Sequence, residues 1–363
     1  MCSKIRIGIT QGDTAGIGLE CALKALADPR ILEIFTPVLY ASESAVELYR
    51  KLAEGEDERL ELRKVASAQR AEDGQINLVV VEDGSKITPG QGSAESGKAA
   101  IKALRMAVED AKNGLVDGLV TMPICKENTL SDEFPYAGHT GYLGDEFEGV
   151  PTMMMISDTM RVALQTTHIP LDQVRQSLSI EGISTKLVEL RESLIRDFGI
   201  VEPRIAVLSL NPHAGEGGVL GSQEIQIITP AIQAAAEQKV YAFGPFAADG
   251  LFLSGGFAKY DALLAMYHDQ GLAPFKALTP DGVNYTAGLD IVRTSPDHGT
   301  AYDIAGKGVA DPQATRNAMY AAVDIIRCRA RHDRMTANPL PHYEREKGRD
   351  VSISELKLPE QHD

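Results

Sequence analysis

Cysteine is scarce in this 363-residue chain, and the patterns missing around it exclude several kinds of site. The four cysteines lie far apart and no Cys-x-x-Cys pair occurs, so neither a zinc ribbon nor a dithiol motif is indicated. No disulfide framework is needed, because 44% of the residues are hydrophobic and can build a large core. Reduced, widely spaced cysteines predict a cytoplasmic protein.

Long apolar runs and an excess of positive charge are also missing. The first ten residues lack the hydrophobic segment of a signal peptide, and no uncharged apolar run approaches ~20 residues, so no membrane partner is expected. A formal net charge of −15 argues against nucleic acid as a partner. The same charge repels a small anionic substrate, so binding one would require a local cluster of Lys and Arg.

Strand and helix patterns alternate along most of the chain. Strands are expected within residues 4–10, 36–42, 76–83, 115–124, 151–171 (two adjacent strands), 203–210 and 261–267. Helices are expected within residues 19–29, 96–114, 184–199, 222–238 (kinked at Pro230) and 315–332. This alternation predicts an α/β fold with a mostly parallel or mixed sheet covered on both faces. Residues 51–75 suggest irregular surface, and residues 333–363 a loosely held tail.

Three of the eight histidines follow an apolar strand pattern and precede a loop. His168 ends VALQTTH, His213 ends IAVLSLNPH and His268 ends ALLAMYH. Three neutral imidazoles from three strand ends would leave a divalent metal with open positions, as a catalytic metal needs. The alternative is that each is an ordinary hydrogen-bonded loop histidine. Asp249 and Asp269 are nearby candidates for a further ligand or a base, or are simply turn residues.

Several polar residues near His268 could bind an anion. Lys276 and Arg293 carry the cationic groups that suit phosphate or carboxylate, and the amide of Asn284 lies between them in sequence. In GHTGY, His139 and Thr140 could donate to the same anion, or could shape a turn. Ordinary surface charge is the alternative for each Lys and Arg.

Two glycine-rich segments differ in what they indicate. GITQGDTAGIG contains no Gly-x-Gly-x-x-Gly, and a structural turn explains it better than a dinucleotide fingerprint. DHGTAYDIAGKGVADP, residues 297–312, combines small residues and glycines that let a backbone approach a flat ligand or expose N–H groups to phosphate. Its composition allows any nucleotide or none.

Long motifs in order along the chain give it a family resemblance. LQTTHIPL, LNPHAGEGG, GPFAAD, AMYHDQGLAPFK and GVNYTAGLDIVRTSPDHGTAYDIAGKG together resemble the 4-hydroxythreonine-4-phosphate dehydrogenases of vitamin B6 biosynthesis, from about residue 4 to 330. HGTAYDIAG is also similar to the HGSAPDIAG cofactor loop of isocitrate and isopropylmalate dehydrogenases. The resemblance implies their fold: two α/β/α domains with the active site in the cleft between them.

The resemblance also implies roles for particular residues. His168, His213 and His268 would bind a divalent metal (Zn, Mg, Mn or Co) in a site shared across a homodimer. His139, Thr140, Lys276, Asn284 and Arg293 would hold the phosphorylated substrate, with Asp249 or Lys276 as the catalytic base. The cofactor, NAD with NADP as the alternative, would lie on a loop whose binding residues are His298, Gly299, Thr300, Ala301, Asp303 and Gly306.

The same resemblance divides the chain into domains and leaves the substrate open. Residues 1–131 plus 286–335 would bind NAD, residues 132–285 would carry substrate, metal and dimer contacts, and residues 336–363 would form a polar tail. Close paralogues oxidise phosphorylated sugar acids such as 4-phospho-threonate and 4-phospho-erythronate. A phosphotransacetylase-like transferase and a non-catalytic binding protein are further alternatives, which NADH formation would separate from a dehydrogenase.

Overall fold

The computed structural model describes residues 4–53, 60–81 and 87–340. The strands are β1 (Arg6–Thr10), β2 (Thr36–Ala41), β3 (Leu62–Val65), β4 (Ile76–Val80), β5 (Gly118–Thr121), β6 (Gly149–Ile156), β7 (Arg161–Leu164), β8 (Arg204–Leu208), β9 (Tyr241–Phe246), β10 (Ala262–Ala265), β11 (Val283–Leu289) and β12 (Val292–Pro296). The helices are α1 (Gly18–Leu26), α2 (Ile31–Ile34), α3 (Glu43–Ala53), α4 (Ala94–Lys112), α5 (Lys126–Thr129), α6 (His139–Glu146), α7 (Leu171–Ser177), α8 (Ile180–Phe198), α9 (Thr229–Glu237), α10 (Ala248–Leu253), α11 (His268–Leu278) and α12 (Gln313–Thr336). Short turns of other helix types are η1 (Ala68–Arg70), η2 (Pro212–Gly218), η3 (Glu224–Ile228) and η4 (Gly256–Lys259).

All of these strands belong to one twelve-stranded sheet in the order β3-β4-β2-β1-β5-β12-β11-β6-β7-β10-β8-β9. The six strands from β3 to β12 run parallel to one another, and so do the four from β7 to β9. Between these blocks, β11 pairs antiparallel with β12 and β6, and β6 pairs antiparallel with β7. The predicted α/β class with a mostly parallel sheet is therefore confirmed, and a single sheet runs through the molecule.

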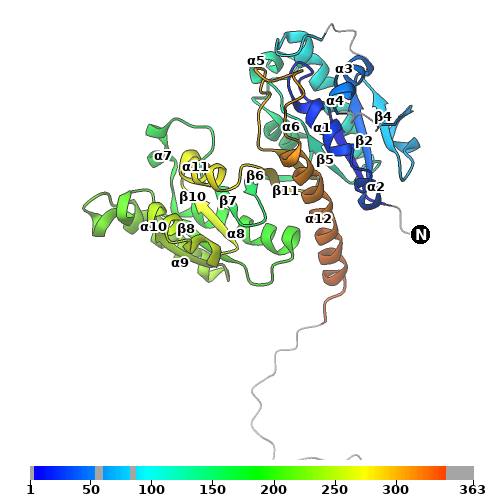
Figure 1. Cartoon of the computed structure of the whole chain (residues 1–363). Helices are drawn as coiled ribbons and strands as arrows, with labels where there is room; N and C mark the ends of the chain where they lie inside the picture. Colours follow the sequence, from blue (N-terminus) through cyan, green and yellow to red (C-terminus); the bar gives the residue numbers. More distant parts are fainter. Residues whose placement is uncertain (1–3, 54–59, 82–86, 341–363) are drawn as a thin grey trace, which may run out of the picture.

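Two lobes lie on either side of β6 and β11 (Figure 1). The first carries β1–β5 with α1–α6, and the second carries β7–β10 with α7–α11. Helix α12 contacts α1 in the first lobe and α8 in the second, so it packs against both. The functional domain boundaries inferred from the resemblance stay a prediction.

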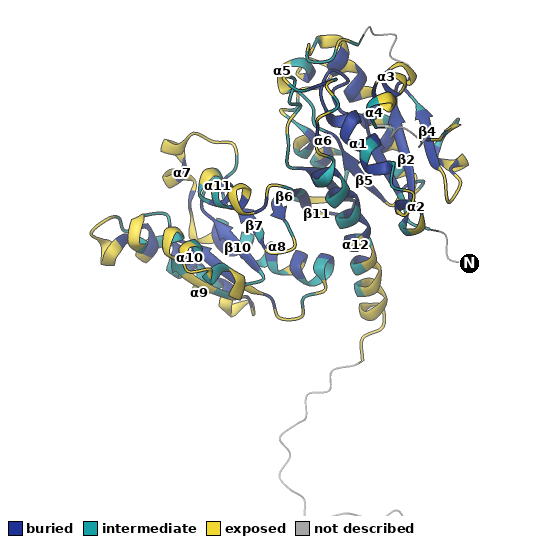
Figure 2. Ribbon diagram, in the orientation of Figure 1, coloured by how far each residue is buried: buried dark blue, intermediate teal, exposed yellow. Residues whose placement is uncertain are grey.

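The core follows from the hydrophobic pattern of the strands. Every residue of β2 and β10 is buried, as expected for parallel strands covered by helices on both faces (Figure 2). Helix α4 begins at a capping box in which Ser93 and Ser96 bond each other's backbone N–H, and it buries the face of Ile101, Leu104 and Val108 predicted from their spacing. No helix in the described ranges is long and apolar enough to cross a membrane.

The segment after β10 differs from its prediction. A loop was expected to follow His268, but residues 268–278 form α11. Gly271 serves packing instead: a Cβ there would lie 2.8 Å from Val162, 2.9 Å from Leu164 and 3.0 Å from Ala265. Glycine thus lets α11 lie close against β7 and β10, while Pro274 is accommodated inside the helix.

The other differences concern strands that were not predicted and the C-terminal residues. Edge strands β3 and β9 and the pair β11–β12 carry no apolar run strong enough to predict them. Pro230 lies in the first turn of α9, directly after the π-helical turn η3, and the kink expected there stays a prediction. Residues 333–336 are helical rather than tail, and residues 341–363 of the predicted tail lie outside the described residues.

Candidate active site

Two of the predicted metal ligands lie side by side in the second lobe. Because β7 and β10 are parallel neighbours, with Leu164 opposite Ala265, the residues that follow them lie at the same sheet edge. The Thr166 hydroxyl donates to the Met266 carbonyl at 2.7 Å and ties the two connections together. The rings of His168 and His268 consequently have their centroids 5.9 Å apart.

The surroundings of His168 favour a neutral imidazole. The pKa of His168 is lowered, first because packing withdraws the ring from water, and then because Lys126 and His268 add positive charge nearby. His268 Nδ1 lies at hydrogen-bond distance, 2.7 Å, from Asp269 Oδ1, and this contact orients the ring. A neutral ring oriented by a carboxylate is the form in which histidine binds a metal.

His213 stands apart on the segment after β8. Residues 213–217 all have left-handed backbone angles, with φ between 43° and 77°. The buried Glu224 carboxylate fixes the start of this segment by accepting from the backbone N–H of Leu210 and Asn211 at 2.9 and 2.8 Å. Within the described residues, no three His, Cys, Asp or Glu side chains lie close enough to hold a metal. One chain therefore brings together His168 and His268, but not His213.

A buried cation lies on β12, between β5 and β11. Arg293 is 3% exposed, and its Nε and Nη2 donate to Thr121 Oγ1 at 2.9 and 2.6 Å, while Nη1 donates to Thr286 Oγ1 at 3.0 Å. Burial lowers the pKa of Arg293 to about 10. Across the described ranges no carboxylate forms an ion pair with Arg293. The guanidinium donates hydrogen bonds only to two neutral hydroxyls, so its charge is not balanced.

Polar atoms near this guanidinium lack partners. His139, the first residue of α6, is buried, and its Nε2 has no hydrogen-bond partner. Its pKa lies well below the usual value because of burial and then the charge of Arg293. Asn284 of β11 lies opposite Ser295 of β12, and its Oδ1 is also buried without a partner. Thr140 is half-buried beside His139. A buried cation surrounded by unsatisfied polar groups is suited to an anion.

Lys276 and Asp249, the two candidate bases, differ in their surroundings. Lys276, half exposed near the end of α11, forms an ion pair with Asp297 at 2.9 Å, which links the helix to the segment after β12. Burial raises the pKa of Asp297, and the charge of Lys276 opposes that rise. Asp249 is exposed in α10, and the described residues provide no hydrogen-bond partner for its side chain.

The predicted cofactor residues lie in the connection between β12 and α12. His298 Nε2 is 3.4 Å from Thr315 Oγ1, and burial lowers the pKa of His298. The Thr300 carbonyl accepts from Ile17 N–H at 2.9 Å. Ala301 and Gly306 adopt positive φ angles of 43° and 76°. At Gly299 a Cβ would meet nothing within 4 Å, so the loop leaves open space there, and Asp303 is exposed.

Sequence reasoning missed two features of this region. Lys126 is the first residue of α5, and its positive charge helps to lower the pKa of His168, although the two residues lie more than 40 positions apart. Asp13, Asn128 and Tyr302 form a hydrogen-bonded cluster from three separate segments. The strand order, which the sequence does not reveal, explains the second feature: β5 is flanked by β1 and β12 in parallel, so the segments after these strands share an edge.

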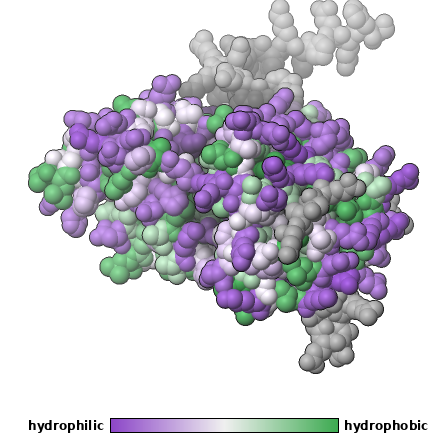
Figure 3. Space-filling model, turned by 90° about the horizontal axis from the view of Figure 1, so that it is seen from above, coloured by the Kyte–Doolittle hydropathy of each residue, from purple (hydrophilic) through white to green (hydrophobic). Residues whose placement is uncertain are grey.

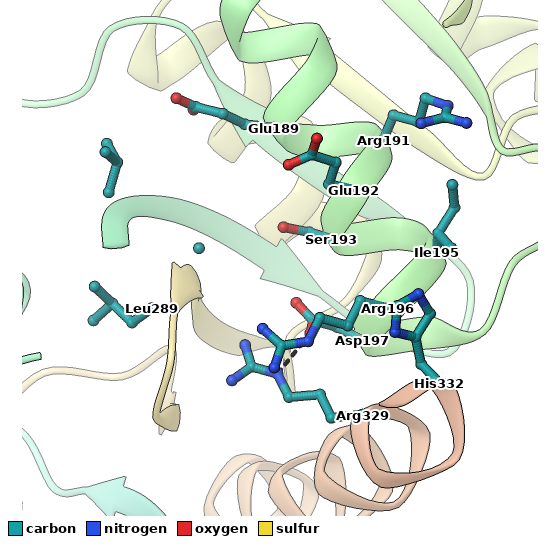
Figure 4. Close-up of a pocket in the computed structure, with 12 residues that line it drawn as sticks. Glu189, Arg191, Glu192, Ser193, Ile195, Arg196, Asp197, Leu289, Arg329 and His332 are labelled. Carbon is teal, nitrogen blue, oxygen red and sulfur yellow. Dashed lines mark hydrogen bonds and ion pairs between the residues drawn. The ribbon is translucent and has the colours of Figure 1, made fainter. Parts of the chain in front are cut away.

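Two cavities lie away from the predicted site residues. One of about 580 Å³ lies between α8, α12 and the end of β11 (Figure 4), and a second of about 860 Å³ lies beside the β6–β7 turn and α12. Neither is lined by a predicted site residue. In the first, the buried Arg329 is paired with Asp197 at 2.7 Å, and Tyr285 bonds both (Figure 4 draws the ion pair). Because these two buried charges are paired with each other, neither requires a counter-charge from a ligand.

Comparison with known proteins places the chain in a family. The family model of the pyridoxal phosphate biosynthetic protein PdxA matches residues 33–322. The chain belongs to the PdxA family. A 4-hydroxythreonine-4-phosphate dehydrogenase of Bacteroides thetaiotaomicron is 46% identical over 93% of each chain. A crystal structure of the Klebsiella pneumoniae protein of that name has a TM-score of 0.77 at 34% identity, and covers 90% of this chain and 98% of the other.

Not every relative of this PdxA-family chain has the same name. An Oceanobacillus iheyensis protein, provisionally named a D-threonate 4-phosphate dehydrogenase, is 36% identical over 90% of this chain and 99% of its own length. The two names differ in the phosphorylated substrate, 4-hydroxythreonine 4-phosphate in one and D-threonate 4-phosphate in the other. Both are dehydrogenases of a phosphorylated acid.

Proposed function

We propose that this chain catalyses the NAD-dependent, metal-assisted oxidation of 4-phosphohydroxy-L-threonine to 2-amino-3-oxo-4-phosphooxybutanoate, which loses carbon dioxide to give 3-amino-2-oxopropyl phosphate, as a step in pyridoxal phosphate biosynthesis. Family membership supports the reaction class. The observation that carries the proposal is the buried, carboxylate-free Arg293, with unsatisfied atoms of His139 and Asn284 nearby. A folded protein tolerates such a group where a ligand supplies the missing charge.

The substrate phosphate would be the anion that completes this pocket. Arg293 would offer a guanidinium already oriented by Thr121 and Thr286, so little side-chain entropy is lost on binding. His139 and Thr140 would donate from the start of α6, and Lys276 would add a second cation from α11. Charge-assisted bonds to the remote phosphate would orient the carbon that reacts.

A divalent metal would be held by His168, His268 and a third imidazole. The pair of rings fits two positions of such a site, and within the described residues of one chain His213 does not join them as a third ligand. We assign the third position to His213 of a second copy, in a homodimer with a shared active site. When bound, the metal supplies a Lewis acid for the substrate hydroxyl and the resulting carbonyl, and NAD supplies the hydride acceptor.

The surface around His213 supports a second copy at this place. Large hydrophobic side chains are exposed directly after η2, on η3 and on the neighbouring edge strand β9: Val219, Leu220, Ile225, Tyr241 and Phe243. Figure 3 shows hydrophobic groups at the outer end of the second lobe, within an otherwise hydrophilic surface. Burying them against a partner would also cover the unpaired edge of β9.

The residues of this chain would handle the substrate proton. Lys276 or Asp249 would accept it from the hydroxyl, directly or through water. Lys276 is better supported, because it extends from the helix that carries His268 and is held by Asp297. The residues of the loop from His298 to Gly306 would hold the cofactor, since that loop leaves open space at Gly299. A cytosolic location belongs to this proposal: Cys21, Cys125 and Cys328 are free thiols.

The second candidate is oxidation of a phosphorylated sugar acid, favoured by the Oceanobacillus relative. The test uses purified protein with zinc, manganese or magnesium and NAD or NADP, and measures NADH or NADPH absorbance. The 4-phosphohydroxy-L-threonine reaction should exceed those of 4-phospho-D-threonate and 4-phospho-D-erythronate in kcat/KM. A higher kcat/KM with one of the sugar acids would make that sugar acid, rather than 4-phosphohydroxy-L-threonine, the substrate. If none of the three substrates supports reduction of NAD or NADP, the dehydrogenase proposal is rejected.

A further inference from the structure

Three segments that are distant in sequence meet where β1, β5 and β12 end. Because these strands are parallel neighbours, their following segments share one edge of the sheet. The backbone ties them together: Asp13 N–H donates to the Pro123 carbonyl at 2.9 Å, and Ile17 N–H donates to the Thr300 carbonyl at 2.9 Å. These two bonds fix the segment after β1 both to the segment after β12 and to the segment after β5.

Three side chains close a hydrogen-bonded triangle at this junction. The Tyr302 hydroxyl donates to Asp13 Oδ2 at 2.8 Å. Asn128 Nδ2 donates to the same carboxylate oxygen at 3.2 Å and to the Tyr302 oxygen at 3.0 Å. The other carboxylate oxygen of Asp13 accepts from Ala15 N–H at 3.0 Å. Asp13 is 1% exposed, so Tyr302 and Asn128 supply donors that its buried Oδ2 would otherwise lack.

The backbone before α4 packs closely against Tyr302. A Cβ at Gly92 would lie 2.5 Å from the Tyr302 hydroxyl, and one at Gly90 would lie 2.8 Å from the Tyr302 carbonyl. Gly90 N–H also donates to the Ala15 carbonyl at 2.8 Å. The position of the Tyr302 ring therefore depends on close backbone approach from the residues before α4.

The members of the triangle connect two parts of the proposed active site. Tyr302 lies among the predicted cofactor-binding residues 298–306, while Asn128 lies on α5, two residues after Lys126. Lys126 is the cationic side chain that bears on His168. A displacement of Tyr302 would thus move the loop and, through Asn128, would also move α5.

We propose that Asp13, Asn128 and Tyr302 form a positioning unit that holds the nicotinamide-cofactor loop in its binding conformation and couples that loop to α5 beside the histidine pair. This inference rests on the proposed function, because it takes a nicotinamide cofactor as the ligand of the loop. The three residues act through the loop and helix that they hold. None of them is assigned contact with the reacting atoms.

The test measures NADH binding by fluorescence titration of the full chain, without substrate. Tyr302→Phe keeps the ring and removes only the hydroxyl, and should weaken NADH binding about tenfold, as expected for loss of one hydrogen bond to a buried carboxylate. The matched control is Tyr40→Phe. The Tyr40 hydroxyl is also buried and donates to a carboxylate, that of Asp110, at 2.7 Å, but it lies outside the triangle. This control should lower thermal stability and leave NADH affinity unchanged.

A second variant tests whether the residues act as one unit. Asn128→Ala should also weaken NADH binding, and Tyr302→Phe combined with Asn128→Ala should weaken it by less than the product of the two single effects, because both act through Asp13. In turnover, the rise in KM for NAD should exceed the fall in kcat. Circular dichroism checks folding, and Asn128→Ala carries the test if Tyr302→Phe does not fold.

Each outcome separates this inference from the proposed function. Wild-type protein that binds neither NADH nor NADPH rejects the proposed function, and this inference with it. Wild-type protein that binds NADH while Tyr302→Phe binds it equally well overturns the positioning unit alone. An equal loss of NADH affinity in Tyr40→Phe, or independent effects in the double variant, also overturns it by reducing the triangle to a general contribution to stability.

Discussion

The Arg293 pocket and the histidine pair differ in how fully one chain builds them. Around Arg293, residues from β5, β11, β12 and α6 come together, and what is missing is a counter-charge. At the pair formed by His168 and His268, what is missing is a ligand, since His213 lies on a separate segment after β8. The pocket is thus suited to completion by a small anion, and the pair to completion by a metal and a second copy of the chain.

The largest expected effect tests the histidine pair, which lacks a third ligand within one chain. His213→Ala should abolish metal retention and turnover, a loss of at least about 100-fold, since even residues that only support metal ligands commonly cost 10- to 100-fold. The fold should survive, because His213 is exposed. Metal content by atomic emission, with NADH formation, checks this result. A variant that retains metal and turns over normally would remove His213 from the site.

The next effect tests whether Arg293 serves binding rather than stability. Arg293→Met should weaken inorganic phosphate binding about 100-fold, the loss expected for charge-assisted hydrogen bonds. It should not lower the free energy of unfolding, because an unpaired buried cation costs desolvation energy.

The matched control for Arg293 is Arg329, a buried arginine that is paired with Asp197. Arg329→Met should cost about 3–5 kcal/mol of stability, because it strands a buried carboxylate, and should leave phosphate affinity unchanged. Phosphate titration calorimetry and urea unfolding of both variants provide the comparison. If Arg293→Met is as destabilised as Arg329→Met, the pocket is structural.

A smaller effect concerns how α11 brings His268 to His168. Gly271→Ala should cost about 1–3 kcal/mol, because the added methyl group meets Val162, Leu164 and Ala265 at 3.0 Å or less. It should also weaken metal binding by moving the helix. Gly250→Ala on α10 is the control, where a Cβ meets nothing within 4 Å. Urea unfolding separates them, and equal stability of the two variants would contradict the close packing of α11.

The smallest effect concerns pH and the pocket. The pKa of His139 is lowered in the folded state by burial and by Arg293, so below about pH 6.5 the unfolded chain binds a proton that the folded chain does not. Stability should therefore fall as pH drops below that value. His139→Gln should remove about 1 kcal/mol of this loss between pH 7.5 and 5.5. A wild-type slope that persists in His139→Gln would place the titration elsewhere.

Much of this account could be predicted from sequence where local pattern decides the structure. Periodicity predicted α4, α8 and α12, and apolar runs predicted β2, β4 and the β6–β7 pair, because these elements bury one face or both. The loop expected after His268 was wrong because glycine there serves helix packing. Asp13, Asn128 and Tyr302 could not be predicted, because only the strand order brings them together.

Mixing two inactive variants tests the central claim, a metal site shared between two copies, most directly. His168→Ala and His213→Ala homodimers are each expected to be inactive, so they would be combined, unfolded and refolded together, and assayed for NADH formation. Random pairing makes half of the dimers mixed, each with one intact site, so the mixture should recover about a quarter of wild-type activity. If no activity returns from a mixture that has refolded and exchanged subunits, the site is not shared between copies.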